Sequence, residues 1–256
     1  MRGGGMTPAT QERLVAIASP LAALLAWQAL ADGGVLDTRY LPSPWRILLA
    51  GEQLARSGDL WAHTRASLYR LAVGFALGAV PGILIGMMMG LNRFLRAALD
   101  PLIAATYPIP KIAVLPLLML VFGIGDGSKI AVVAVSVLLL SAINTMTGVL
   151  GIDRVYFDVA KNFRSPPWKL FTRVILPAAL PTVFAGLRIS LGVALVVLVG
   201  AEFVASRAGI GYLIWSSWET LAVEDMFVGI IVITMLGVVT TQVLKECERF
   251  FLPWRH

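Results

Sequence analysis

The sequence predicts an all-helical integral membrane protein, and its composition and hydropathy carry that prediction. Of the 256 residues, 58% are hydrophobic and 14% are charged, whereas soluble domains are about 45–50% apolar and about 25% charged. The mean hydropathy is +0.81. Because so little polar material cannot cover a water-facing surface, lipid must be the solvent for most of the chain.

Apolar stretches of the length of a membrane span support the same fold class. Crossing the hydrocarbon core of a bilayer takes about 20 helical residues, and six stretches approach or exceed this length. We therefore predict six transmembrane helices. They lie at residues 14–31, 68–91, 97–122, 129–150, 178–205 and 226–245.

The first stretch has an alternative interpretation. It ends in Ala29-Leu30-Ala31, which resembles a signal-peptidase site, so a cleaved signal peptide is the alternative. Its apolar run of 18 residues is long for the core of a signal peptide, and we favour a retained helix. In the connection that follows, we expect one amphipathic helix over residues 44–57.

A stripe of glycines marks the second span, where a glycine recurs at every fourth residue. A helix face without side chains lets a neighbouring backbone approach closely, and such packing holds lipid-embedded helices together. We expect the stripe to pack against another helix of the same chain, with a dimer interface as the alternative. The residues are Gly74, Gly78, Gly82, Gly86 and Gly90.

Prolines interrupt the third span at positions 101, 108, 110 and 116. Each proline removes a backbone donor and disturbs the helix, and backbone groups freed at membrane depth need protein or water partners. We therefore expect this span to be irregular, and to be buried in the helix bundle or to line a cavity.

The basic residues favour an orientation with both termini in the cytoplasm. Of the 21 Lys and Arg residues, twelve fall in the predicted inside segments, seven in the outside segments and two within spans, in agreement with the positive-inside rule. Topology thus accounts for the net charge of +6, and nucleic acid is not an expected partner. With one cysteine, Cys247, and two distant histidines, His63 and His256, neither a disulfide nor a metal cluster is expected.

The longest predicted inside segment, residues 151–177, is the candidate functional element. Val155, Val159 and Phe163 recur at intervals of four, which predicts an amphipathic helix that ends near Ser165. Its apolar face is too small to fold alone, so we expect this loop to dock on a partner protein. The alternative is an interfacial helix held flat on the lipid surface by its basic residues.

The second half of the segment predicts a turn followed by another helix. Pro166 and Pro167 remove backbone donors and push the preceding residue toward extended geometry. Trp168, Phe171 and Ile175 then follow at spacings of three and four, which is typical of a second short helix. Two short helices joined by a tight turn are therefore expected.

The loop resembles a known signature. Asp158-Val159-Ala160, with Arg164 six residues after Asp158 and an apolar run that ends in Leu176-Pro177, resembles the cytoplasmic loop of ABC importer permeases. That family pattern reads Glu-Ala-Ala, three residues, Gly, and then an apolar-Leu-Pro ending. In the family this loop is the coupling helix, which inserts into a groove on the ATP-hydrolysing subunit.

Further motifs, spread over residues 40–253, are similar in order and spacing to permeases for taurine, alkyl sulfonates, nitrate and bicarbonate. Each piece alone is weak, whereas together and in register they form a strong resemblance. They are Ser67-Leu68-Tyr69-Arg70 with Gly74-Phe75, Pro110–Leu117, Phe122–Gly125 with Ser128–Ile130, Gly186-Leu187-Arg188, Ala201-Glu202 and Gly209-Ile210-Gly211.

The resemblance implies a type I importer permease in a bacterial inner membrane. Its domains would be a tail and first helix at 1–36, a periplasmic connection at 37–63, the transmembrane domain at 64–247 and a cytoplasmic tail at 248–256. Partners would be a second copy of the chain, two cytoplasmic ATPases that carry ATP and Mg, and a periplasmic or lipid-anchored substrate-binding protein. The residues implied in ATPase coupling are Asp158, Val159, Ala160, Lys161, Phe163, Arg164, Trp168 and Pro177.

The chain itself is not expected to be an enzyme. Residues 122–129 are rich in glycine, but the Gly-Lys-Ser/Thr order of a phosphate-binding loop is absent and no strand precedes them. No nucleophile, base and orienting group are grouped in the spans either. A secondary transporter is the alternative, but it usually needs a carboxylate at mid-depth and an inverted repeat, and neither is evident.

Two residues depart from the family loop. Asp158 replaces Glu, which keeps the charge and shortens its reach. Arg164 replaces Gly, and a left-handed conformation costs a residue with a side chain roughly 1 kcal/mol or more. We therefore expect this turn to be built differently, through residues 165–167.

Polar residues at membrane depth are candidates for a translocation pathway, because such groups usually face a cavity or a partner. We predict that Lys111, Asn144 and Arg188 mark an anion path between two protomers. Glu202, near the outer rim, is a further candidate. The alternative is structural: Arg188 holds the loop or an inner gate, and Glu202 caps a neighbouring helix. Taurine or another sulfonate is the favoured substrate, followed by nitrate and bicarbonate.

Overall fold

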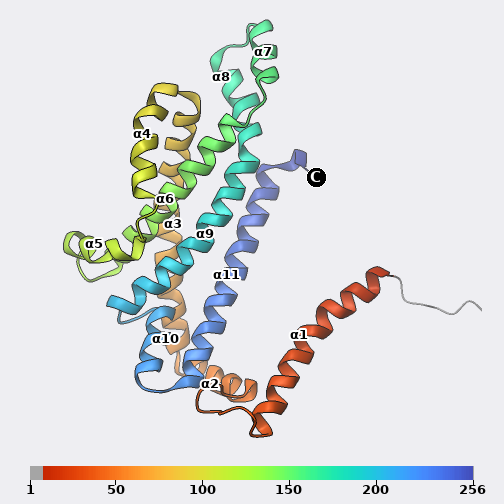
Figure 1. The fold of residues 1–256 in the computed structure, drawn as a ribbon, viewed down its shortest axis with the longest axis vertical. Helices are drawn as coiled ribbons and strands as arrows, with labels where there is room; N and C mark the ends of the chain where they lie inside the picture. Colours follow the sequence, from red (N-terminus) through yellow and green to blue (C-terminus); the bar gives the residue numbers. More distant parts are fainter. Residues whose placement is uncertain (1–7, 256) are drawn as a thin grey trace, which may run out of the picture. The chain divides into compact units, whose positions relative to one another are not determined.

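The computed structural model describes residues 8–255 and is helical throughout, with no strand among those residues (Figure 1). The predicted all-helical fold is confirmed. The chain forms two compact units, one of residues up to 61 together with 213–230, and one of residues 62–212 together with 231–256.

The first unit contains α1 (Pro8–Asp32), α2 (Pro44–Ser57) and parts of α10 (Ile210–Glu219) and α11 (Val223–Phe251). The predicted helix over residues 44–57 is confirmed. Its start is capped by the Ser43 hydroxyl, which accepts from Arg46 N, and it ends at Gly58 with φ 85°, a conformation that suits glycine. The backbone N–H of Trp45 donates to Gln28 Oε1 at 3.0 Å, which ties α2 to α1.

The second unit is a bundle built around α6 (Asp126–Leu150) and α9 (Leu176–Ala205), which lie side by side (Figure 1). Most of α3 (Asp59–Leu91) packs with them, and the carboxyl-terminal part of α11 also belongs to this unit. The core is aliphatic and aromatic. Its members include Leu71 and Ala79 of α3, Val133 and Val137 of α6, and Phe184, Leu187, Leu191 and Leu198 of α9.

Four helical segments of the described chain are long and apolar enough to cross a membrane, namely α3, α6, residues 167–204 and α11. The predicted third span is bent by 90° between α4 (Arg93–Thr106) and the segment Lys111–Phe122, which contains α5 (Leu115–Phe122). Its predicted irregularity is confirmed. Residues 14–31 are helical within α1 but are not among the four, so the count of six spans remains a prediction.

The glycine stripe packs inside the chain, as predicted, against α6. A Cβ atom built on Gly82 would lie 2.6 Å from the carbonyl oxygen of Leu138 and 2.9 Å from Ser141 Cβ, and one on Gly74 would lie 2.8 Å from a methyl of Val133. Side chains larger than hydrogen cannot occupy these positions unless α3 and α6 separate. The close approach of the two helices therefore depends on the stripe.

Candidate functional site

The loop between α6 and α9 begins with the predicted amphipathic helix. Helix α7 runs from Arg154 to Asn162, and the Asp153 carboxylate caps its start by accepting from Val155 N at 3.0 Å. It lies beyond the end of α6, at the end of the bundle formed by these helices (Figure 1). The helix ends three residues earlier than the sequence pattern indicated, because a capping turn occupies residues 163–165.

The capping turn overturns one prediction. Arg164 itself adopts the left-handed conformation, with φ 48°, so the turn is built at the position of the family glycine and not by residues 165–167. Arg164 N donates to Lys161 O and Ser165 N donates to Ala160 O, each at 2.9 Å. These two bonds form a Schellman motif, and they stabilise a conformation that costs a non-glycine residue roughly 1–2 kcal/mol.

The second predicted short helix is not a separate element, which is a further correction. Pro166 precedes α8 (Pro167–Leu170), which continues through a π-helical turn (Phe171–Ile175) directly into α9. A π turn shifts the backbone hydrogen bonds by one residue. Pro177 follows it in the first turn of α9, where a missing N–H is tolerated. The loop is therefore a direct extension of a membrane-spanning helix.

A buried apolar cluster holds the loop against the ends of the membrane helices. It contains Met87 of α3, Val149 of α6 and Ile175 at the start of α9, with Phe157 and Phe171 packed against it. One loop helix and the start of α9 thus share a common core with two spans. A force on the loop would therefore be transmitted to these helix ends.

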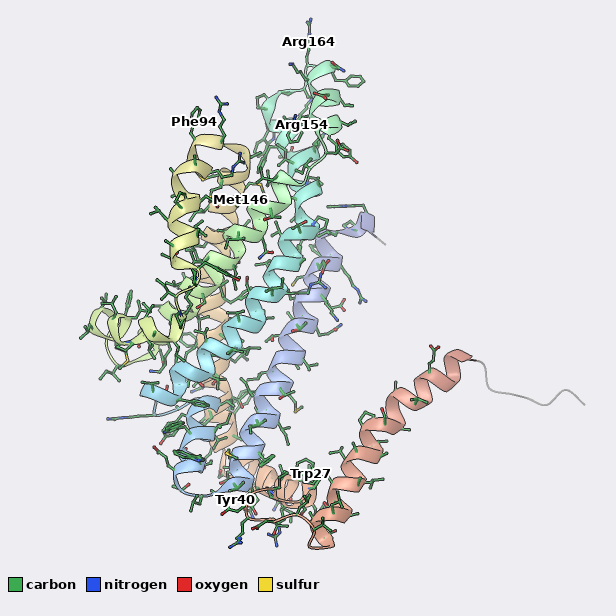
Figure 2. The ribbon with its side chains drawn as sticks, viewed as in Figure 1. Trp27, Tyr40, Phe94, Met146, Arg154 and Arg164 are labelled. Carbon is green, nitrogen blue, oxygen red and sulfur yellow. The ribbon has the colours of Figure 1, made fainter. Side chains whose placement is uncertain are left out.

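The opposite face of the loop is apolar and exposed. Phe163 is 80% exposed and Trp168 is 72% exposed, and Val155, Tyr156 and Val159 of α7 are also exposed. Arg164 projects from the tip of the loop, while Arg154 lies at the other end of α7 (Figure 2). These side chains are the ones that a partner protein can contact.

The residues implied in coupling divide into two groups. Asp158, Val159, Lys161, Phe163, Arg164 and Trp168 are exposed, whereas Ala160 is 8% exposed and Pro177 is partly buried. The Ala160 carbonyl oxygen accepts the hydrogen bond from Ser165 N that caps α7. Ala160 and Pro177 therefore support the loop, and only the first group forms its outer surface.

The three residues of the predicted anion path each have local partners. Lys111 donates to the carbonyl oxygens of Thr106, Tyr107 and Ile109 at 2.8–2.9 Å, and so caps the end of α4 at the 90° bend. Asn144 donates to Leu140 O within α6, and Arg188 pairs with Glu248 of α11 at 3.1 Å. The structure does not gather them into one cluster.

Glu202 lies in a buried polar cluster instead. The carboxylate is 0% exposed, and it accepts from Arg70 Nη1 at 2.6 Å, from Ser67 Oγ at 2.9 Å and from Gly211 N at 2.8 Å. Gly211 lies in the first turn of α10, so Glu202 does cap a neighbouring helix. The carboxylate thereby joins α3, α9 and α10 residues of one unit.

Arg70, which the sequence analysis named only as part of a motif, is the functional residue missed here. Its guanidinium is 5% exposed and also contacts Asp126 at 2.7 Å and Ala208 O at 2.7 Å. The signal in the sequence was the spacing of Ser67 and Arg70, which places both on one face of a helix. Nothing in the sequence alone shows that this face meets Glu202, 132 residues further along the chain.

These observations define a class: a helical membrane protein of several spans, with an exposed apolar loop mounted on its core. Comparison with known proteins gives the family. Residues 82–246 match the binding-protein-dependent transport system inner membrane component family. The chain belongs to this family of ABC transporter permeases.

Three relatives carry more specific names. The "Putative aliphatic sulfonates transport permease protein SsuC" of Bacillus subtilis is 36% identical over 237 residues, which cover 93% of this chain and 86% of that protein. The taurine transport system permease protein TauC of Escherichia coli is 32% identical, with coverages of 96% and 92%. The bicarbonate transport system permease protein CmpB of Synechococcus elongatus is 35% identical, with coverages of 93% and 89%.

Proposed function

We propose that this chain is the membrane-spanning subunit of an ATP-driven importer of small anionic or zwitterionic solutes, and that it works as a homodimer. The exposed apolar face of the α7–α8 loop, mounted on the ends of α3, α6 and α9, is the observation that supports ATPase coupling. Two cytoplasmic ATPases would bind this face and hold ATP and Mg, and an external binding protein would deliver the solute. The chain would lie in a bacterial inner membrane, with both termini in the cytoplasm.

The proposed mechanism is mechanical. Closure of the ATPase pair would displace the loop, and the shared core would carry that displacement into α3, α6 and α9. Because α8 runs into α9 through the π turn, bending between the loop and the span would concentrate at residues 171–175. The permease itself would catalyse no reaction.

The test replaces Phe163 by Asp, with Phe94→Asp as the matched control. Phe163 is 80% exposed and Phe94 is 72% exposed in α4, outside the loop (Figure 2). A buried aromatic anchor at an interface contributes about 2 kcal/mol or more, so Phe163→Asp should reduce ATPase affinity roughly 30-fold. Phe94→Asp should leave it within about threefold.

The readout is substrate-stimulated ATP hydrolysis by the complex reconstituted in lipid vesicles, together with co-purification of the ATPase. Equal stimulation in the wild type and the Phe163→Asp variant would refute coupling through the loop. Uptake that continues after removal of ATP would instead identify a secondary transporter. Lipid-surface binding of the loop predicts that the substitution changes neither measurement.

The substrate class is supported by the names of the relatives. Two of the three are named for sulfonates or taurine, and one for bicarbonate. We place taurine and other alkyl sulfonates first, with nitrate and bicarbonate next. A competition series against the purified binding protein, with taurine, methanesulfonate, nitrate and bicarbonate, distinguishes these substrates.

We retain Lys111, Asn144 and Arg188 as proposed polar points along the pathway. Lys111 and Arg188 carry the positive charge that an anion path would use, although each also has a structural contact. Lys111→Met and Arg188→Gln should lower the uptake rate of an anionic solute more than that of a zwitterion. If rate and selectivity in vesicles are unchanged in the double variant, these residues do not line the path.

A further inference from the structure

A cavity of about 620 Å³ adjoins the buried cluster around Arg70 and Glu202. It lies between the start of α6 and the segment that follows α9, within one compact unit. Its volume is in the range of small-molecule sites. Four side chains with hydrogen-bonding or charged groups, besides that of Arg70, line its wall: Asp126, Lys129, Ser206 and Arg207.

The charges around this cavity do not cancel. Arg70 is shared between Asp126 and Glu202, with contacts of 2.7 and 2.6 Å. Lys129 is 1% exposed and its Nζ donates to Gly125 O at 3.0 Å; Asp126 and Glu202 act on it electrostatically, but no carboxylate of the described residues lies within 4.0 Å of it. With Arg207 added, three cations line the cavity against Asp126 in its wall and the buried Glu202 behind Arg70, which leaves one positive charge in excess.

A buried cation without a carboxylate in direct contact is unfavourable, since removing an ion from water carries a large desolvation penalty. An anion in the cavity would lower this penalty for Lys129 and would balance the excess charge. Ser206 adds a second feature. Its hydroxyl oxygen is buried, lies at a residue that lines the cavity and has no hydrogen-bond partner among the described residues.

We propose that this cavity binds a small organic monoanion, a sulfonate or a carboxylate, through Arg207 and through the Ser206 hydroxyl, which would turn into the cavity on binding, in the field of Lys129 and Arg70. One negative charge matches the excess, and a planar guanidinium and a hydroxyl suit the oxygens of such a group. That the bound anion is also the transported solute rests on the proposed function. The binding site itself does not.

The site is tested by direct binding to the full chain in nanodiscs of zwitterionic lipid, without ATP or partner proteins. The probe is methanesulfonate, followed by ligand-observed NMR, with methylammonium as the cationic counterpart. Arg207→Gln is the main variant, because this side chain is exposed and holds no other element in place. Arg65→Gln is the matched control, since Arg65 is exposed on α3 near Arg70 but does not line the cavity.

We expect the wild type to bind methanesulfonate but not methylammonium. Arg207→Gln should weaken binding roughly tenfold, the effect of losing one charge-assisted contact, and Arg207→Lys should recover part of it. Arg65→Gln should change the affinity less than twofold. Size-exclusion chromatography confirms that each variant is folded.

Two results would overturn the proposal: no binding of methanesulfonate to the wild type, or equal weakening by Arg207→Gln and Arg65→Gln. A third arm uses nanodiscs that contain phosphatidylglycerol. If that lipid suppresses methanesulfonate binding, the cavity holds a lipid phosphate and the proposal also fails. None of these arms needs an ATPase, so the site and the proposed coupling can fail separately. If Phe163→Asp leaves substrate-stimulated ATP hydrolysis unchanged while methanesulfonate still binds, the proposed coupling is refuted and the site stands.

Discussion

Replacing Glu202 by Gln tests how strongly the buried cluster holds the bundle together. The substitution keeps the shape of the side chain but removes its charge, so Arg70, which is 5% exposed, loses a partner at 2.6 Å. Ser67 Oγ and Gly211 N also lose a charged acceptor. Removing one partner of a buried ion pair costs about 3–5 kcal/mol. With about 2–4 °C per kcal/mol for a chain of this size, the midpoint of thermal unfolding should fall by about 6–20 °C.

The assay is thermal stability in detergent, followed by the fraction of protein that remains in the size-exclusion peak after heating. Glu246→Gln is the control, because Glu246 pairs with Arg249 at 2.8 Å while both side chains are more than half exposed. Exposed pairs contribute about 0–1 kcal/mol, so this variant should shift the midpoint by less than about 4 °C. An equal shift in the two variants would refute the reasoning. Adding Arg70→Met to Glu202→Gln should cost less than the sum of the single changes, since the unpaired charge is then removed.

Three further predictions concern the backbone. Arg164→Gly should relieve the left-handed strain and slow proteolysis of the loop, in line with a gain of roughly 1 kcal/mol; faster cleavage would contradict the Schellman assignment. Gly82→Leu should lower the yield of the monodisperse protein in detergent, because even a Cβ atom there would meet Leu138 O at 2.6 Å; a wild-type elution profile would remove the stripe from the packing argument. Gly209→Ala should destabilise the chain by at least as much as a capping loss, about 1 kcal/mol or more, since Gly209 has φ 127° and a Cβ atom would press on the Glu202 carboxylate; an unchanged unfolding midpoint would show that this turn can relax.

Much of the fold follows from the sequence because lipid imposes simple rules. Long apolar runs predict spans, and the glycine repeat predicts the face of α3 that meets α6, since both depend on local composition and helical period. The bend after α4 was also predictable, because proline removes backbone donors. The continuity of α8 with α9 was not. A π turn depends on the tertiary packing around the backbone. Phe171–Ile175 have no sequence feature that distinguishes them from the start of a short helix.

The candidate site shows the same limit. The exposed face of α7 could be predicted because Val155, Val159 and Phe163 follow a helical period. The partnership of Arg70 with Glu202 could not, since it depends on which helices meet in space. Arg164 shows a different limit: the sequence indicated the cost of a left-handed arginine, but only the structure shows that this residue adopts that conformation, together with the two Schellman bonds.

The segment 167–204 connects the two proposed sites, the ATPase-binding loop and the anion cavity. It is one helical stretch of 38 residues, roughly 57 Å at 1.5 Å per residue. One end shares a core with α7, and the other carries Glu202 beside the proposed anion cavity.

Coupling between two sites is reciprocal. If an ATPase on the loop lowered the affinity of the cavity for an anion tenfold, an anion in the cavity would lower the affinity of the loop for that ATPase by the same factor. The proposed import mechanism needs this relation, because solute would have to bind tightly before the loop is engaged and weakly afterwards. The helical segment 167–204, packed at both ends and interrupted only by the π turn at 171–175, is the element whose displacement would produce it.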